Sequence, residues 1–313
     1  MSLSHAHAPE PASCSAASAR LGEPLAGTAP VAGRWLAIEQ TGPWGAKALT
    51  TSHFPPELGH ALSRRAEAAG VRIALIRRPG HHAEHDPQAP RRVFLADTRP
   101  GRGALWSWST SDPATLLDLD FDVPGKPLHE GGPLLLVCTN GKRDTCCALS
   151  GRALAAWLAE DAATDSASIW ESDHLGGHRF APTAVVLPTG YVYGRLDGPA
   201  ASGILRDAAA GKVGGPLCRG RSTWSRPGQA AELVLRAELQ EHGPDAVAVL
   251  AERQLEPVPD GPDRRYEVTL GVGGDRFRAV LAESAAAEPR PESCGKPFGK
   301  PLELRLVSLE KDG

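Results

Sequence analysis

Residues 134–161 read LLLVCTNGKRDTCCALSGRALAAWLAED, and this stretch decides the fold. Its first five residues, 134–138, form a short unbroken apolar run, which is typical of a strand covered on both faces. A polar loop follows at 139–145. From residue 146 onward, apolar residues recur at spacings that share one helical face, with alanines between them. These apolar residues are Leu149, Leu154, Trp157 and Leu158. The stretch predicts a buried strand, a loop and an amphipathic helix.

The segments after this helix complete a recognisable order of elements. We expect a second strand at about 168–171, a hairpin within 183–196 and a closing helix at 199–210. Strand, helix, strand, hairpin and helix is the order of a thioredoxin-like domain, in which the first two strands run parallel through a right-handed crossover.

The same order of elements occurs earlier in the chain. Its expected segments are strands at 35–39 and 71–77, a helix at 57–69, a hairpin at 93–97 and 104–107, and a short helix near 113–119. We therefore predict an α/β (α+β) fold with two tandem thioredoxin-like domains, at 33–128 and 129–224. The first is predicted to be degenerate, because no cysteine lies between Gly33 and Pro124.

The two ends of the chain have different expected structures. Residues 225–313 predict a small α+β C-terminal region, with a helix at 229–242 and strands at 265–270, 275–282 and 302–309. The segment 283–301 is rich in Ala, Pro and Gly and is expected to be loosely ordered. Residues 1–32 lack the pattern of a secretory signal and predict a disordered leader.

Composition indicates a soluble globular protein of the cytoplasm. The 313 residues are 41% hydrophobic, which is enough to bury a core, and the net charge is −3. This charge gives no reason to expect nucleic acid or an anionic membrane as a partner. The apolar runs are also far shorter than the roughly 20 residues that a membrane span needs. Six cysteines make a poor disulfide framework in a chain of this length, so clustered Cys and His favour a metal.

Two cysteines and two histidines are the candidate metal ligands. Cys138 ends the predicted buried strand, and Cys147 lies in the first turn of the following helix, where a helix N-terminus favours the thiolate. His174 and His178 are separated by Leu-Gly-Gly, and the glycines allow a turn that could aim both imidazoles at one centre. Taken singly, such a Cys is usually a small core residue and such a His is usually solvated. Together the four suit either zinc or an iron-sulfur cluster, and their spacing alone does not separate the two.

Two sequence motifs carry a resemblance to a known family. The stretch VCTNGKRDTCCA at 137–148, followed by HLGGHRFA at 174–181, resembles the sucrase/ferredoxin-like family. Shorter similar segments lie at 33–36, 42–45, 78–81 and 293–295. Members of this family are thioredoxin-like ferredoxins, and some hold a [2Fe-2S] cluster with two Cys and two His. The resemblance implies that the ligands are Cys138, Cys147, His174 and His178. A shift of the helix register by one residue would substitute Cys146, which otherwise is expected to be a buried helix-start residue.

The expected function is electron transfer. Two neutral imidazoles in place of two thiolates make the ligand set less negative, which raises the reduction potential. Imidazole can also couple electron uptake to protonation. We predict a protein that exchanges electrons with unidentified protein donors and acceptors. The alternative is a structural or regulatory zinc module with the same four ligands. A hydrolase is less favoured, because no pair of acidic residues stands out.

Overall fold

The computed structural model describes residues 13–312 apart from 85, 257, 259, 260, 262 and 263. In this part of the chain, a nine-stranded mixed sheet, a four-stranded antiparallel sheet and a two-stranded sheet combine with helices. The predicted α+β class is confirmed. No helix among these residues is both long and apolar enough to cross a membrane.

The first half of the large sheet contains four strands. They are β1 (Arg34–Glu39), β2 (Val71–Arg77), β3 (Arg91–Asp97) and β4 (Ala104–Thr110). Strand β1 pairs in parallel with β2, and helix α2 (Pro56–Ala68) supplies the crossover that a parallel pair needs. Strand β1 also pairs antiparallel with β3, and β3 with β4, which gives the order β4-β3-β1-β2. A short 3-10 helix, η1 (Pro113–Asp118), stands where the closing helix was expected.

The second half repeats this order. Its strands are β5 (Leu134–Cys138), β6 (Ile169–Ser172), β7 (Ala184–Leu187) and β8 (Tyr191–Tyr193). Strands β5 and β6 are parallel through helix α3 (Arg152–Glu160), and β7 and β8 follow on the other side of β5. All five residues of β5 are buried, as the unbroken apolar run predicts. Helix α4 (Gly198–Ala209) comes next, and β9 (Cys218–Arg221) extends the sheet beyond β8.

One antiparallel contact joins the two halves into a single sheet. Strand β2 pairs with β6 through Ile76 opposite Ser172 and Arg77 opposite Glu171. Alternate residues of the strands point to opposite faces, and one face packs against α2 in the first half and α3 and α4 in the second. The other face includes Cys138 and is covered partly by the N-terminal segment that contains Cys14. The candidate ligands therefore lie on the face away from these helices.

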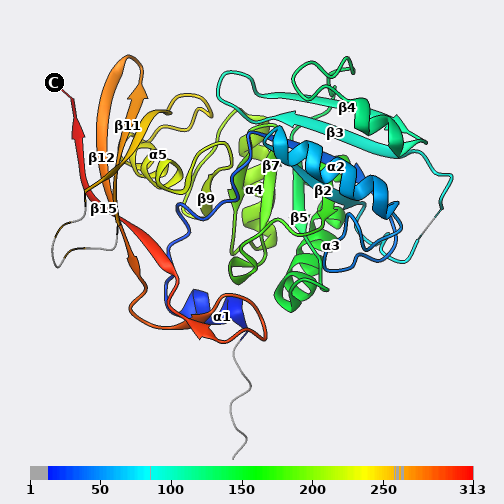
Figure 1. Ribbon diagram of the computed structural model, residues 1–313, viewed down its shortest axis with the longest axis horizontal. Helices are drawn as coiled ribbons and strands as arrows, with labels where there is room; N and C mark the ends of the chain where they lie inside the picture. Colours follow the sequence, from blue (N-terminus) through cyan, green and yellow to red (C-terminus); the bar gives the residue numbers. More distant parts are fainter. Residues whose placement is uncertain (1–12, 85, 257, 259–260, 262–263, 313) are drawn as a thin grey trace, which may run out of the picture.

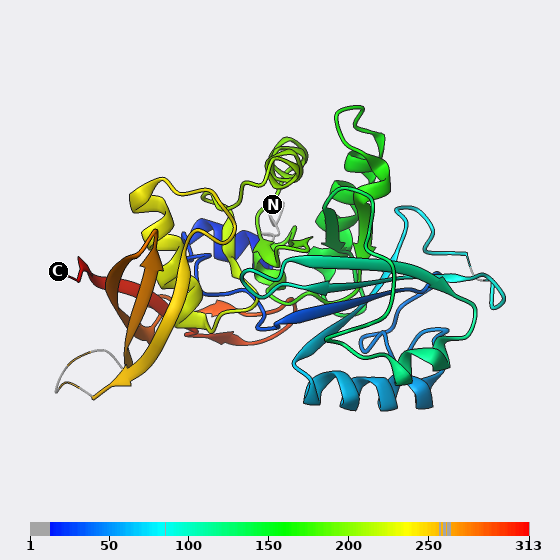
Figure 2. The ribbon, with the colours of Figure 1, turned by 90° about the horizontal axis from the view of Figure 1, so that it is seen from above.

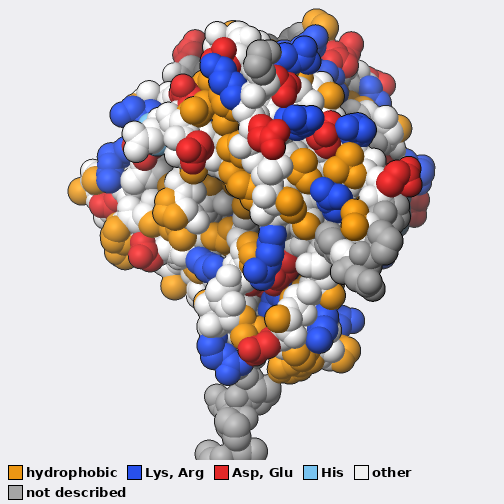
Figure 3. All heavy atoms as spheres, turned by 90° about the vertical axis from the view of Figure 1, so that its left-hand side faces the viewer, with side chains coloured by type: hydrophobic (Ala, Val, Ile, Leu, Met, Phe, Trp, Pro, Cys, Tyr) orange, Lys and Arg blue, Asp and Glu red, His pale blue; other side chains and the backbone are white. Residues whose placement is uncertain are grey.

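The C-terminal region forms a separate small sheet. Helix α5 (Arg226–Leu239) packs against strands β10 (Ala248–Leu255), β11 (Arg264–Val272), β12 (Asp275–Ala285) and β15 (Leu302–Lys311). Figure 2 shows this sheet at one end of the molecule, and Figure 3 shows apolar side chains lying among basic and acidic ones on that end. The segment 283–301 is more ordered than expected, because it contains the end of β12 and the hairpin of β13 (Arg290–Pro291) with β14 (Phe298–Gly299).

The N-terminal segment is ordered where it is described, which corrects the expected disordered leader. Helix α1 (Cys14–Arg20) begins after Ser13, whose hydroxyl accepts a hydrogen bond from the backbone of Ala16. Figure 1 shows α1 beside the orange-to-red segment from the opposite end of the chain. The richness of residues 1–32 in Ala, Ser, Pro and His suggested disorder, but polar contacts with the rest of the chain hold residues 13–32 in place. Residues 1–12 lie outside the described part.

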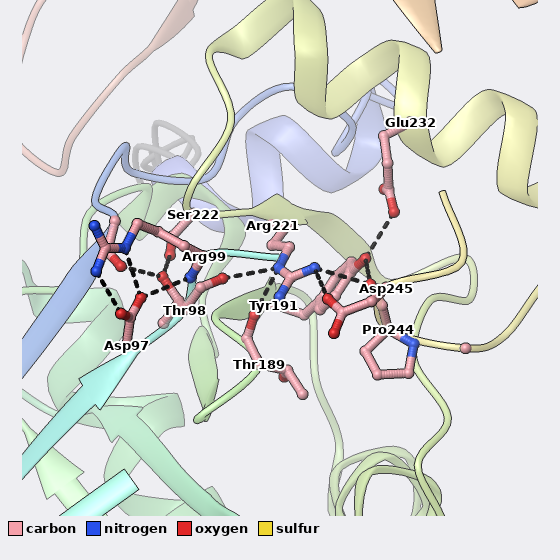
Figure 4. A network of polar contacts seen from close by, with 12 residues as sticks. Asp97, Thr98, Arg99, Thr189, Tyr191, Arg221, Ser222, Glu232, Pro244 and Asp245 are labelled. Atoms are coloured by element: carbon pink, nitrogen blue, oxygen red, sulfur yellow. Dashed lines mark hydrogen bonds and ion pairs between the residues drawn. The ribbon is translucent and has the colours of Figure 1, made fainter. Parts of the chain in front are cut away.

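Buried polar contacts also hold β9 against both halves of the sheet. The Arg221 guanidinium donates to the backbone oxygens of Thr98, in the first half, and Thr189, in the second, at 3.0 and 3.1 Å. Nearby, the Tyr191 hydroxyl donates to Glu232 at 2.7 Å, and Figure 4 shows both sets of contacts. Because buried polar groups are costly unless they are paired, these contacts favour one position of β9 relative to the two halves of the sheet.

We expect Glu23→Gln to loosen the N-terminal segment. Glu23 accepts from Arg290 and, at 2.7 Å, from Arg179. Burial raises the pKa of Glu23, but the hydrogen bond from Arg290 and the charge of Arg179 outweigh burial, so the net pKa lies below its ordinary value. A lowered pKa contributes stability above the unfolded value of about 4.3, and this contribution is lost as pH falls through the folded pKa.

The variant should therefore lower the free energy of unfolding by about 1.5–3 kcal/mol at pH 7, as expected for a hydrogen bond to a charged group. The difference from the unmodified chain should shrink as pH falls below about 4. Urea unfolding at several pH values measures both quantities, with Glu57→Gln, at an exposed position of α2, as the control. A difference that stays constant between pH 7 and acid would contradict the assigned ion pairs.

Candidate metal centre

The two predicted cysteine ligands lie together at the end of β5. Cys138 is its last residue, and Cys147 begins the π-helical turn η2 (Cys147–Gly151) that leads into α3; each is 1% exposed. The Cys147 thiol hydrogen-bonds to the Cys138 sulfur, which holds the pKa of Cys138 well below its ordinary value. The same contact raises the pKa of Cys147. The contact therefore favours one thiolate on the pair and opposes a second.

A glycine allows these cysteines to meet. An ideal Cβ at Gly151 would lie 2.0 Å from the carbonyl oxygen of Cys138. Only a residue without a side chain lets the helix come this close to the end of β5. Gly151 therefore fixes the distance between the strand that carries one cysteine and the turn that carries the other.

We expect Gly151→Ala to separate Cys138 from Cys147. The added methyl group would collide with the backbone, which cannot move as a flexible side chain does. We therefore expect the free energy of unfolding to fall by about 1–3 kcal/mol, and the purified protein to hold much less metal. Gly203→Ala on α4 is the matched control, because a Cβ there would lie 3.8 Å from its nearest neighbour, the Arg206 guanidinium, and alanine favours a helix by about 1 kcal/mol. Metal content and thermal unfolding of both variants test the prediction. Equal metal content in the two would refute it.

The two predicted histidine ligands lie side by side in the loop after β6. The rings of His174 and His178 are 5.4 Å apart between centroids and 30° from parallel. Leu175 between them is fully buried and anchors the loop, while the neighbouring His174 ring further lowers the pKa of Cys138. The Nδ1 atoms of both histidines are buried without a hydrogen-bond partner. The structure thus brings all four predicted residues to one place.

Two arginines from outside the loop hold it in position. The Arg72 guanidinium of β2 donates to the backbone oxygen of His174 at 2.9 Å, and that of Arg219 on β9 donates to Gly176 at 3.0 Å. Gly177 has a φ of 73°, and a Cβ there would lie 2.2 Å from Arg219. Because Arg72 belongs to the first half of the sheet, the half without cysteines helps to position the histidines. Sequence reasoning did not find either arginine.

Asp144 lies between His178 and a second group of sulfurs. Its carboxylate is 4.0 Å from His178 Nε2. Burial raises the pKa of Asp144, but hydrogen bonds from the backbone of Cys294 and Cys146 and from the Ser293 hydroxyl outweigh it, so the net pKa is lowered. For His178, burial lowers the pKa while the Asp144 charge opposes this shift. Asp144 is thus an ionised neighbour of the histidine loop.

The adjacent cysteines Cys146 and Cys147 face different neighbours. The Cys147 sulfur meets Cys138, whereas the Cys146 sulfur lies 3.5 Å from that of Cys14 and 3.2 Å from that of Cys294. Cys146 is buried at the start of the helix, as expected. The partners of Cys294 were missed, because Cys14 and Cys294 are far apart in sequence and no spacing rule connects them.

Two thiols and two imidazoles are chemically suited to an iron-sulfur cluster, although the group of described residues whose ligand atoms all lie within 4.8 Å of one another is Cys14, Asp144, Cys146 and Cys294. Buried nitrogens without a partner are costly, and coordination would satisfy both Nδ1 atoms. Thiolate and imidazole are the ligands that zinc and iron-sulfur clusters take in proteins. Fold and site together define a mixed α/β protein with a candidate metal centre lined by cysteine and histidine.

The family follows from comparison with known proteins. Residues 25–220 match the family model described as sucrase/ferredoxin-like, and the chain belongs to this family. No curated protein and no solved structure matches the chain. The resemblance noted in the cysteine and histidine motifs is therefore confirmed at the level of the family.

Proposed function

We propose that this protein is a one-electron carrier that holds a [2Fe-2S] cluster with Cys138, Cys147, His174 and His178. The observation that carries the proposal is that two buried sulfurs lie beside the His174 ring, and that the Nδ1 atoms of His174 and His178 have no hydrogen-bond partner. When bound, such a cluster accepts and releases one electron. Membership of a family described as sucrase/ferredoxin-like supports the same reading.

The residues around the site would set how readily an electron is accepted. Two neutral imidazoles in place of two thiolates reduce the negative charge of the ligand set, which favours the reduced state. The hydrogen bond from Arg72 to the His174 backbone orients the loop that carries the two histidines. Hydrogen bonds of this kind to metal ligands normally adjust the reduction potential of a metal centre. Protonation coupled to reduction stays a prediction of the sequence.

Electrons would enter and leave on the side of His178. Cys138 and Cys147 are each 1% exposed, whereas the His178 side chain is 14% exposed. His178 borders a hollow of about 530 Å³ that Arg143 and Lys296 also line. Two basic side chains beside one acidic residue, Glu292, favour a redox partner that presents an acidic surface.

The absorption and EPR spectra of anaerobically purified protein test the proposal. We expect a red-brown protein with visible absorption, about two iron and two sulfide per chain, and an EPR signal that appears on reduction. A colourless protein that holds zinc at these four residues would overturn the proposal in favour of the zinc module. A protein with neither metal after anaerobic reconstitution with iron and sulfide would overturn it as well.

A further inference from the structure

Three cysteines from distant parts of the sequence meet beside the proposed cluster site. Cys14 begins α1, Cys146 precedes η2, and Cys294 lies in the hairpin between β13 and β14. Their sulfur atoms are 3.5 Å apart for Cys14 and Cys146, 3.2 Å for Cys146 and Cys294, and 3.6 Å for Cys14 and Cys294. Cys14 and Cys146 are buried, and Cys294 is partly buried.

These distances suit one metal ion better than a disulfide. Bonds of about 2.3 Å from zinc to sulfur place the sulfurs of a tetrahedral site about 3.8 Å apart, close to the separations seen here. A disulfide joins two sulfurs at about 2.05 Å and would leave the third thiol of the triangle without a partner. All three mutual separations are similar, as a shared central ion requires.

A carboxylate supplies a fourth ligand. One carboxylate oxygen of Asp144 and the three sulfurs all lie within 4.8 Å of one another. Asp144 Oδ1 accepts from the backbone of Cys146, and Oδ2 from the backbone of Cys294, both at 2.9 Å. The Ser293 hydroxyl also donates to Oδ2 at 2.9 Å, so Oδ1, which accepts one backbone hydrogen bond, is the oxygen that keeps a lone pair for a metal. The carboxylate is thus oriented by two of the three segments that carry the sulfurs.

We propose that Cys14, Cys146, Cys294 and Asp144 form a second, mononuclear site for a thiophilic divalent cation such as zinc. Binding displaces the thiol protons to solvent and leaves three thiolates and one carboxylate around the ion. The family resemblance implies no ligand role for Cys14 or Cys294. The site is independent of the cluster, although Cys146 and Cys147 are consecutive residues and Asp144 lies between the two centres.

The second site would fasten both ends of the chain to the loop that carries the cluster ligands. Cys14 comes from the N-terminal segment, Cys146 from the turn beside Cys147, and Cys294 from the C-terminal hairpin. The match to the family ends at residue 220, so the hairpin lies beyond it. Because a bound metal contributes its binding energy to the folded state, its role is structural. Removing the ion should free the segments around α1 and β13 before the central sheet.

Metal analysis of the whole chain tests this proposal. We expect about one zinc per chain in addition to iron in protein purified anaerobically from medium that contains both metals. Cys14→Ser and Cys294→Ser should each lower the affinity for Zn²⁺ by roughly tenfold or more and leave the visible spectrum of the cluster unchanged. Co²⁺ in place of zinc should give a sulfur-to-metal charge-transfer band whose intensity falls in both variants.

Matched variants separate this site from the proposed cluster. Cys218→Ser removes a buried core thiol outside the group and should keep both metals. Cys138→Ser should lose iron and keep zinc, so failure of one site is distinguishable from failure of the other. Protein that neither retains zinc nor binds added Zn²⁺ after anaerobic reduction would overturn the proposal. A mass that shows a disulfide within the group in the anaerobic protein would overturn it too. Removal of the ion by a chelator should make protease cleavage within residues 13–25 faster, and this measurement does not depend on the variants.

Discussion

Replacing Cys138 with serine should remove nearly all bound iron and sulfide from the purified protein. Cys138 is the last residue of a fully buried strand, and it contacts both Cys147 and the His174 ring, so it is the central residue of the proposed ligand set. Serine fits the same space but is a much poorer ligand for iron, so we expect a loss of roughly tenfold or more in iron content and visible absorbance. Iron and sulfide assays together with the absorption spectrum measure this loss.

Two other cysteine variants make the result specific. Cys218→Ser should keep the iron content of the unmodified chain, because Cys218 is buried on β9 in a different core cluster. Cys146→Ser should also keep its iron, because the Cys146 sulfur contacts Cys14 and Cys294 rather than Cys138. Loss of iron in Cys146→Ser together with retention in Cys147→Ser would show that the two adjacent cysteines have been assigned in the wrong order.

Local sequence patterns predicted the elements of the large sheet well. The run 134–138 is a strand buried along its whole length, and 71–77 is a strand with the expected bounds. These elements follow from periodicity and apolar content within a few residues of chain. The antiparallel contact of β2 with β6 could not be predicted in this way, because it depends on two strand edges that are almost 100 residues apart. The domain boundaries at 128 and 224 stay predictions.

The candidate sites show the same difference between residues that local patterns group and residues that only long-range contacts bring together. Cys138, Cys147, His174 and His178 lie in two short motifs, so the sequence was enough to group them, and their role as ligands stays a prediction. Cys14 and Cys294 come from segments expected to be disordered or loosely ordered, and both segments are held by long-range polar contacts such as that of Arg290 with Glu23. Pairwise contacts of this kind leave no periodic pattern in the sequence. The three-cysteine group was therefore visible only in the structure.

Replacing Arg77 with methionine should cause a large loss of stability at the junction of the two halves. The Arg77 guanidinium donates to the Glu171 carboxylate at 2.8 Å and to the Gly42 backbone oxygen at 2.8 Å, and it lies 3.8 Å above the Trp44 ring. Both charged side chains are almost fully buried. Methionine fills much of the space but leaves Glu171 without its cation. Removing one partner of a buried ion pair costs about 3–5 kcal/mol, which corresponds to a fall in melting temperature on the order of 10 °C.

The double variant Arg77→Met/Glu171→Leu should recover most of this loss, because an apolar pair can replace a buried ion pair at little cost. Arg278→Met is the matched control: its ion pair with Glu310 is exposed, so its loss should change stability by less than about 1 kcal/mol. Calorimetry and urea unfolding of the three variants give these differences. Since the pairing of β2 with β6 also brings Arg72 to the histidine loop, Arg77→Met should retain less metal than the double variant. If the single and double variants were equally unstable, the uncompensated charge of Glu171 would not be the cause, and lost packing on Trp44 would explain the result instead.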